Sequence, residues 1–194
     1  MPYSQAHKAR TRERIVESAR RLFNREGFAG VSIDEIMAEA GLTRGGFYNH
    51  FNAKEELYAE VVNEEAKRWS THEMMEGNTA RDLIAAYLSE AHFDDRENCC
   101  PLMAFPSDVA RGGTSVKCAY RRVLEVMVGV LEDGLEGRTE MRGRAMALAA
   151  LCIGGMAVAR AVDDVNLAHE IRKAAKDLAL SVAGQEKTRL EAAE

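Results

Sequence analysis

The sequence predicts an all-α protein, and three features of the chain support this fold class. Prolines stand only at positions 2, 101 and 106, so long segments can form helices without interruption. No segment sustains the alternation of apolar and polar residues that is typical of strands. Apolar residues recur instead at spacings of three and four, the period of an amphipathic helix. We expect about nine helices, in an N-terminal domain over residues 1–52 and a larger C-terminal domain over residues 53–194.

Helix boundaries follow from capping residues. Gly27 is placed to end the first helix, and Ser32 with Glu35 forms a capping box that opens the second. Thr43 caps a third, short helix. The tail from Gly184 has little apolar surface to bury and is expected to be frayed. The expected helices cover residues 8–26, 33–40, 44–50, 53–75, 80–91, 101–111, 116–135, 141–162 and 166–183.

The composition is that of a globular protein. Of 194 residues, 46% are hydrophobic and 29% charged, which excludes wholesale disorder and allows a core without disulfides or structural metals. The longest uncharged stretch, residues 145–159, is shorter than the ~20 residues needed to cross a bilayer, so we expect a buried helix and no membrane association. The N-terminus has no apolar segment that would act as a secretory signal. The four cysteines lack metal-pair spacing, which favours reduced thiols in a cytoplasmic protein.

The charge distribution points to an anionic partner at one end of the chain. The net charge of −5 by itself argues against a nucleic-acid binder. Residues 1–51, however, hold eight Lys and Arg against six acidic residues, whereas residues 52–194 carry a net charge of −7. A basic end on an acidic body indicates a local anionic partner at the N-terminus.

The segment from residue 33 to residue 50 has the pattern of a helix-turn-helix. Two short helices are joined by Ala40-Gly41-Leu42-Thr43, in which Gly41 allows the chain to reverse and Leu42 fills the space between the helices. This pattern alone is weak support for DNA binding, because exposed polar side chains are usually only solvated.

The second of these helices, over residues 44–50, presents a face rich in hydrogen-bond donors. Arg44 can read guanine or hold a phosphate, and Asn49 can pair with adenine in the major groove. Lys54, at the start of the following helix, offers a phosphate site. These donor groups together indicate that this part of the chain contacts double-stranded DNA.

Two other classes of function stay open on residues alone. His92 and Asp95 would face the same way at a helix end and form the one acid–His cluster worth testing, which leaves a small metal-dependent enzyme as an alternative. An N-terminal domain that docks on a protein, as in an adaptor, is the other. No Gly-rich phosphate loop, Gly-x-Ser-x-Gly elbow or Cys-x-x-Cys pair occurs, so we expect no enzyme, no metal and no cofactor.

Residues 10–57 resemble the N-terminal domain of the tetracycline-repressor (TetR) family, in register and without gaps. The segments that carry the resemblance are Arg14-Ile15-Val16-Glu17-Ser18-Ala19, Leu22-Phe23, Glu26-Gly27-Phe28, Val31-Ser32-Ile33-Asp34-Glu35-Ile36, Ala38-Glu39-Ala40-Gly41-Leu42-Thr43-Arg44-Gly45 and Phe47-Tyr48-Asn49-His50-Phe51-Asn52-Ala53-Lys54-Glu55-Glu56-Leu57. Asn49 departs from the aromatic residue or His often found at its position, and Gly46 from the usual Thr or Ala.

The resemblance implies a homodimeric transcriptional regulator, a repressor, whose third helices enter successive major grooves of a palindromic operator. Phe47 and Phe51 are core residues in this interpretation. Taken together, the outer face and the resemblance give these DNA-binding residues: Arg10, Arg12, Ser32, Thr43, Arg44, Gly45, Tyr48, Asn49, His50 and Lys54.

For the rest of the chain, the resemblance implies a helical domain that binds a small-molecule effector and dimerises. Helices 141–162 and 166–183 would pair with their mates across a two-fold axis, although their apolar stripes would also serve to close the monomer's own core. The effector's identity cannot be read from the sequence. The candidate pocket residues, most of which also suit an ordinary core, are Tyr87, Phe93, Met103, Phe105, Tyr120, Val123, Met127 and Met156.

Cys99 and Cys100 precede Pro101-Leu102 in a segment that resembles one found in one branch of these regulators. A helix N-terminus favours the thiolate, so release from DNA by an electrophile or oxidant is an alternative to a bound effector. Packing of Cys100 as a small buried residue is the simpler interpretation.

Overall fold

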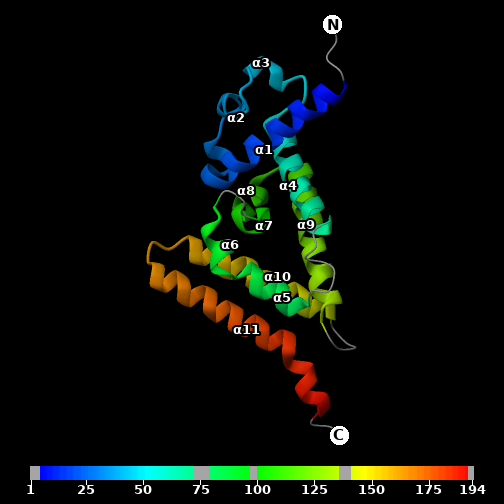
Figure 1. Ribbon diagram of the computed structural model, residues 1–194, viewed down its shortest axis with the longest axis vertical. Coiled ribbons are helices and arrows are strands. Elements are labelled where there is room, and N and C mark those ends of the chain that lie inside the picture. Colours follow the sequence, from blue (N-terminus) through cyan, green and yellow to red (C-terminus); the bar gives the residue numbers. More distant parts are fainter. Residues whose placement is uncertain (1–4, 72–78, 97–99, 136–140, 192–194) are drawn as a thin grey trace. The chain divides into compact units, whose positions relative to one another are not determined.

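The computed structural model describes residues 5–71, 79–96, 100–135 and 141–191, and all regular structure in these ranges is helical, as Figure 1 shows. The all-α prediction is confirmed. The helices are α1 Gln5–Gly30, α2 Ile33–Glu39, α3 Arg44–Phe47, α4 Lys54–Thr71, α5 Ala80–Tyr87, α6 Glu90–Asp94, α7 Pro101–Ala104, α8 Pro106–Arg111, α9 Thr114–Asp133, α10 Met141–Arg160 and α11 Val165–Glu191.

These eleven helices exceed the expected nine because two expected helices are each divided. Ser89 accepts a hydrogen bond from the backbone N–H of His92 and caps α6, which separates α6 from α5. Pro106 has no N–H to donate and opens α8 directly after α7. At the C-terminus, the α11 backbone stays helical to Glu191, beyond the expected end at residue 183, so the expected fraying from Gly184 is wrong for the backbone.

The helices form two compact units. The first comprises residues 1–65 and 96–122, and the second comprises residues 66–95 and 123–194. The first unit therefore includes α7 and α8 together with the N-terminal helices. This division follows packing, and it is distinct from the functional boundary at residue 52 that the sequence suggests.

In the first unit, α1 packs an apolar stripe that includes Ile15, Ala19 and Phe23, all fully buried. The backbone leaves helical geometry at Gly27, where φ is 76°, a value that only glycine adopts without strain. The helix thus breaks where the sequence predicts. Beyond the break, the Phe28 N–H donates to the Asp108 carboxylate of α8 over 3.1 Å.

The second helix begins as predicted. The Ser32 hydroxyl accepts from the Glu35 N–H over 3.2 Å, and the Ser32 N–H donates to the Glu35 carboxylate over 2.7 Å. The hydrogen bond that the Ser32 hydroxyl donates to the Glu35 carboxylate, together with that from the Ser32 N–H, holds the pKa of Glu35 below its usual value.

The third helix is shorter than expected, ending at Phe47 instead of residue 50. Gly45 and Gly46 lower its helix propensity, and the chain continues from Tyr48 to His50 as turns. Phe47 and Phe51 are buried with their ring centroids 5.7 Å apart, which confirms that both are core residues.

In the second unit, α10 packs against α11 and α5. A Cβ added at Gly155 of α10 would lie 2.6 Å from the Ala175 Cβ of α11, so the glycine permits the close approach of the two helices. By length and composition α10 is apolar enough to cross a membrane. Its packed face is nevertheless that of a core helix, with these residues buried: Ala145, Leu148, Ala149, Cys152, Met156 and Ala159.

Candidate nucleic-acid interface

The helix-turn-helix of α2 and α3 exposes most of the side chains predicted to meet DNA. The Tyr48 side chain is 56% exposed although it is large and aromatic. Arg12, His50 and Lys54 are half-buried. The exposed members of the predicted set are Arg10, Ser32, Thr43, Arg44, Gly45, Tyr48 and Asn49. We call these ten predicted residues the α3 face.

Two arginines of the α3 face already have acidic partners. Arg44 Nη1 forms an ion pair with the Asp34 carboxylate of α2, and both side chains are more than half exposed. Arg12 Nη1 pairs with Glu60 of α4 over 2.9 Å, and its guanidinium lies 4.3 Å from the centroid of the Phe51 ring. The structure therefore orients Arg44 from α2 and holds Arg12 against the core of the same unit.

Lys54 is directed at the connection between α1 and α2. Its Nζ donates to the carbonyl oxygens of Phe28 and Val31, each over 2.7 Å, and lies 4.2 Å from the Phe28 ring centroid. Lys54 thus stabilises the backbone just before the α2 capping box. A DNA phosphate that contacts Lys54 would have to share its ammonium group with these two carbonyl oxygens.

His50, which follows α3, has its pKa lowered by its surroundings. Burial is the main cause that lowers its pKa, and the positive charges of Lys8 and Arg12 lower it further. Its Nδ1 is enclosed without a hydrogen-bond partner in the part of the chain that the structure describes.

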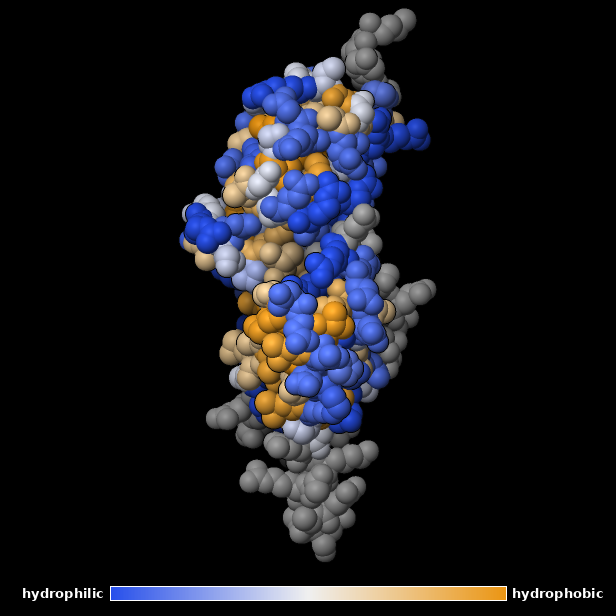
Figure 2. All heavy atoms as spheres, turned by 90° about the vertical axis from the view of Figure 1, so that its left-hand side faces the viewer, coloured by the Kyte–Doolittle hydropathy of each residue, from blue (hydrophilic) through white to orange (hydrophobic). Residues whose placement is uncertain are grey.

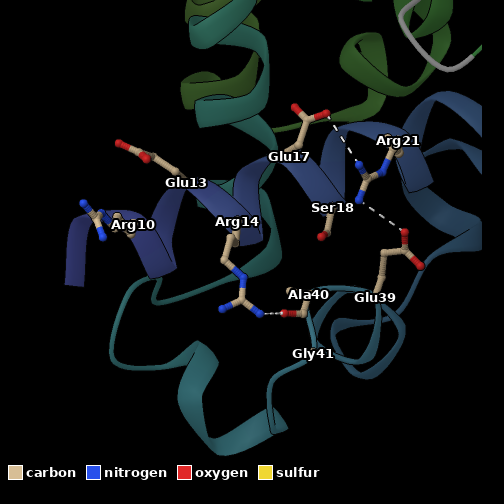
Figure 3. Close-up of a pocket in the computed structure, with 9 residues that line it drawn as sticks. All are labelled: Arg10, Glu13, Arg14, Glu17, Ser18, Arg21, Glu39, Ala40 and Gly41. Carbon is tan, nitrogen blue, oxygen red and sulfur yellow. Dashed lines mark hydrogen bonds and ion pairs between the residues drawn. The ribbon is translucent and has the colours of Figure 1, made fainter. Parts of the chain in front are cut away.

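A shallow hollow lies where α1 meets the turn between α2 and α3 (Figure 3). Arg14 reaches across it and donates to the carbonyl oxygen of Ala40, while Arg21 pairs with Glu17 and Glu39. Gly41 has φ of 65°, and a Cβ there would lie 3.3 Å from Arg14 Nη2. These ionic contacts fix the turn that presents α3, so we interpret the hollow as a structural feature.

The predicted effector residues are divided between the two units. Met103, Phe105 and Tyr120 belong to the first unit, where the Tyr120 hydroxyl donates to the Leu102 carbonyl over 2.8 Å. Phe93 is half-buried in the second unit. The remaining four are fully or almost fully buried there: Tyr87, Val123, Met127 and Met156.

The cysteine and histidine candidates have structural surroundings. Cys100 is buried at the N-cap of α7, a helix of only four residues, and Cys99 lies outside the described residues. His92 Nδ1 donates to the Tyr87 carbonyl oxygen over 2.7 Å, so this nitrogen is already engaged. Among the residues that the structure describes, no group of three or more His, Cys, Asp and Glu is placed to hold a metal ion.

The two C-terminal helices differ in how far their predicted apolar stripes are buried. On α10 the stripe is buried inside the unit, as the core interpretation requires. On α11, Leu178 is 54% exposed and Ala174 is exposed, while Ile171 and Val182 are half-buried. Figure 2 shows hydrophobic side chains on the molecular surface at the height of α10 and α11.

Residues 15–61 match the family model described as bacterial regulatory proteins, tetR family. This match spans the helix-turn-helix and every residue of the α3 face except Arg10 and Arg12. In this N-terminal part the chain is similar to TetR-family regulators.

Relatives of known sequence share chiefly this N-terminal part. An uncharacterised HTH-type transcriptional regulator, YerO of Bacillus subtilis, is 48% identical over 46 residues, covering 24% of this chain and 16% of YerO. The HTH-type transcriptional regulator AcrR of Shigella flexneri is 43% identical over 51 residues, covering 26% of this chain and 24% of AcrR. The chain thus spans less than half the length of these curated relatives.

Solved structures extend the likeness to the TetR fold as a whole. E. coli NemR in its reduced form has a TM-score of 0.73 at 19% identity, over 87% of this chain and 94% of NemR. A transcriptional regulator from Rhodococcus has a TM-score of 0.70 at 26% identity, over 90% of this chain and 96% of that regulator.

Sequence reasoning missed two residues of this site. Asp34 lies within the motif but its pairing with Arg44 depends on how α2 and α3 cross. Asp108 is 80 residues away from Phe28 along the chain, and no local pattern links the two. The only sequence signal that could have pointed to Asp34 was its position, two residues after the α2 N-cap Ser32.

Proposed function

We propose that this chain is a homodimeric transcriptional repressor of the TetR family that binds palindromic operator DNA through the α3 face and is released by a small-molecule effector. The observation that carries the proposal is the α3 face itself. It joins exposed Arg44, Tyr48 and Asn49 on a fixed helix-turn-helix that stands on a buried aromatic core.

Dimerisation would supply the affinity that one four-residue helix lacks. Two reading helices on a two-fold axis bind two half-sites together, in major grooves ~34–36 Å apart. The exposed apolar side chains of α10 and α11 support this arrangement, since burial of exposed apolar surface favours association. The large members of this group are Met146, Val158, Val165, Leu167 and Leu178.

Release by a bound ligand fits the residues better than release by thiol oxidation. Cys100 is only 2% exposed, and an enclosed thiol reacts slowly with oxidants. We therefore propose a ligand of the C-terminal helices as the signal, which acts by changing the separation of the two α3 helices. Peroxide should therefore leave the DNA affinity of the parent protein unchanged, and any release that peroxide does cause should be the same in Cys100→Ser as in the parent.

In vitro selection of duplex sequences by the purified protein tests the DNA-binding proposal. We expect palindromic sequences with a regular half-site spacing, and an affinity that falls steeply as salt rises. Recovery of no enriched sequence at low ionic strength would refute DNA binding. Sedimentation of the free protein as a monomer at micromolar concentration would refute the dimer independently.

A further inference from the structure

Arg172 of α11 is a buried charge that forms no ion pair within the residues that the structure describes. Only 7% of its surface is exposed, and it lies on the inward face of the helix beside Ala168 and Ala175. Its Nε is enclosed and has no hydrogen-bond partner among the residues described. Within the described residues its guanidinium has one partner, the Phe93 ring of α6, whose centroid lies 4.3 Å away. Arginine stays protonated in proteins, so a full positive charge is buried here.

Arg160 of α10 places a second guanidinium against α6, the helix that carries Phe93. Its Nη2 donates to the carbonyl oxygens of His92 and Asp95, at the C-terminal end of α6. Its Nε is also enclosed without a partner in the described part of the chain. Both arginines therefore reach residues 92–95, although they come from different helices.

The pairing of α10 with α11 places the two arginines on the same side of the point where these helices cross. The close approach of Gly155 and Ala175 fixes the register of the two helices. Arg160 lies five residues after Gly155, and Arg172 lies three residues before Ala175. Because the two helices are joined by the short connection 161–164, both arginines lie on the connection side of that crossing.

Within the described residues, neither Arg160 nor Arg172 forms an ion pair with an acidic group. The Asp164 carboxylate accepts from the N–H groups of Asn166 and Leu167 and so caps α11. Asp94 and Asp95 are exposed to solvent. A cation–π contact with Phe93 offsets only part of the cost of burying a charge. A buried charge that is neither paired nor fully hydrogen-bonded is costly, and such groups cluster at binding sites.

We propose that Arg160, Arg172 and Phe93 form a binding site for an oxyanion, the carboxylate or phosphate group of a small-molecule ligand. The guanidinium fork suits either group, and stacking on Phe93 holds the fork in place. Binding is a property of the second unit alone. The further role of this ligand as the effector that releases DNA rests on the proposed function.

Thermal unfolding of the full chain tests the site without DNA. The probes are sodium octanoate and inorganic phosphate, compared with octanol for the tail and with sodium chloride at matched ionic strength. We expect octanoate, phosphate or both to raise the Tm by a few degrees beyond these controls. Octanoate alone would assign a carboxylate ligand, and phosphate alone a phosphorylated one.

Arg172→Met removes the charge and keeps the bulk of the side chain. We expect it to fold, because an apolar residue of similar size suits a buried position, and to weaken anion binding at least tenfold by calorimetry. Arg160→Met should weaken binding as well. The matched control is Arg142→Met, since Arg142 is an exposed arginine of α10 paired with Glu132 over 3.6 Å, and it should bind anions as the parent does.

Two results would overturn the site. One is no stabilisation by either anion beyond chloride, and the other is stabilisation of equal size in the Arg172→Met variant. A separate measurement adds the bound anion to the protein–DNA complex. Anion binding that leaves DNA affinity unchanged would refute the effector role alone, and failure of the parent protein to bind any DNA would refute the proposed function while the site stands.

Discussion

Asp34 of α2 pairs with the guanidinium of Arg44, the first residue of α3, on the exposed side of the helix-turn-helix. A carboxylate thus orients the arginine that the sequence assigns to base or phosphate contact. The same carboxylate would repel the phosphates of DNA that approach α3. Asp34 therefore lowers the affinity for DNA and, in return, fixes the direction of the Arg44 side chain.

Replacing Asp34 by Ala is expected to raise affinity for operator DNA about three- to tenfold and to broaden base preference at the position that Arg44 reads. Exposed ion pairs contribute only about 0–1 kcal/mol to folding, so the protein should stay folded. Fluorescence anisotropy and repeated selection measure the two effects. Asp177→Ala removes the partner of Lys173 in an exposed pair of α11 and is the control. Unchanged base preference in Asp34→Ala would show that Asp34 does not position Arg44.

Replacing Lys54 by Ala should lower the free energy of unfolding by about 1–3 kcal/mol, because the carbonyl groups of Phe28 and Val31 lose their charged donor. If Lys54 also holds a phosphate, the variant binds all sequences more weakly and the salt slope of log K falls by about one. Denaturant titration and DNA binding at four salt concentrations separate the two roles. A lower stability with an unchanged slope would leave Lys54 a structural role only.

Stability should fall as the pH is lowered below about 6.5, the ordinary pKa of His. Burial lowers the pKa of His92 most, and the charge of Arg160 lowers it further, against the Tyr87 hydrogen bond and the Asp95 charge, which raise it. Because the unfolded chain takes up the proton first, its population grows as the pH falls through the folded-state pKa. Urea titrations at pH 7.5 and 5.5 measure the loss, which His92→Gln should reduce. Equal pH dependence in that variant would contradict the assignment.

Replacing Leu178 by Glu should raise the dimer dissociation constant about 100-fold or more. Each protomer would lose the burial of one Leu side chain, worth about 1.5–3 kcal/mol, and gain a charge at the interface. Because Leu178 is half exposed in the single chain, the fold should persist. Analytical ultracentrifugation measures the constant, with Ala86→Glu at an exposed position of α5 as the control. A parent-like dimer in Leu178→Glu would exclude this face.

Local signals in the sequence predicted what depends on local physics. The break at Gly27 follows from backbone freedom, the start of α2 from the Ser32 and Glu35 side chains, and the burial of Phe47 and Phe51 from helical spacing. Each of these involves residues fewer than five apart. They were sufficient to predict the helix-turn-helix and the side chains that it exposes.

Local signals in the sequence could not predict contacts between segments that are distant along the chain. The inward direction of Lys54 depends on carbonyl groups 23 and 26 residues away, and the Arg160 contacts span more than 60 residues. The division of the expected helix 80–91 at Ser89 was missed because a capping serine inside an apolar stripe looks like an ordinary polar position. The burial of Arg172 has no local signal, since charged residues are usually exposed.

The hydrogen bond from Phe28 to Asp108 has a consequence for chimeric regulators. In a chimera, the N-terminal domain of one relative would replace that of another at residue 52. This exchange would separate the Phe28 N–H from its acceptor Asp108. It would also separate the ring of Phe23 from that of Tyr58, whose centroids are 5.2 Å apart. Such a graft would leave a polar group and an aromatic surface without their native neighbours. A transplant that carries residues 1–65 together with 96–122 keeps that packing intact, so the transferable module is discontinuous in sequence.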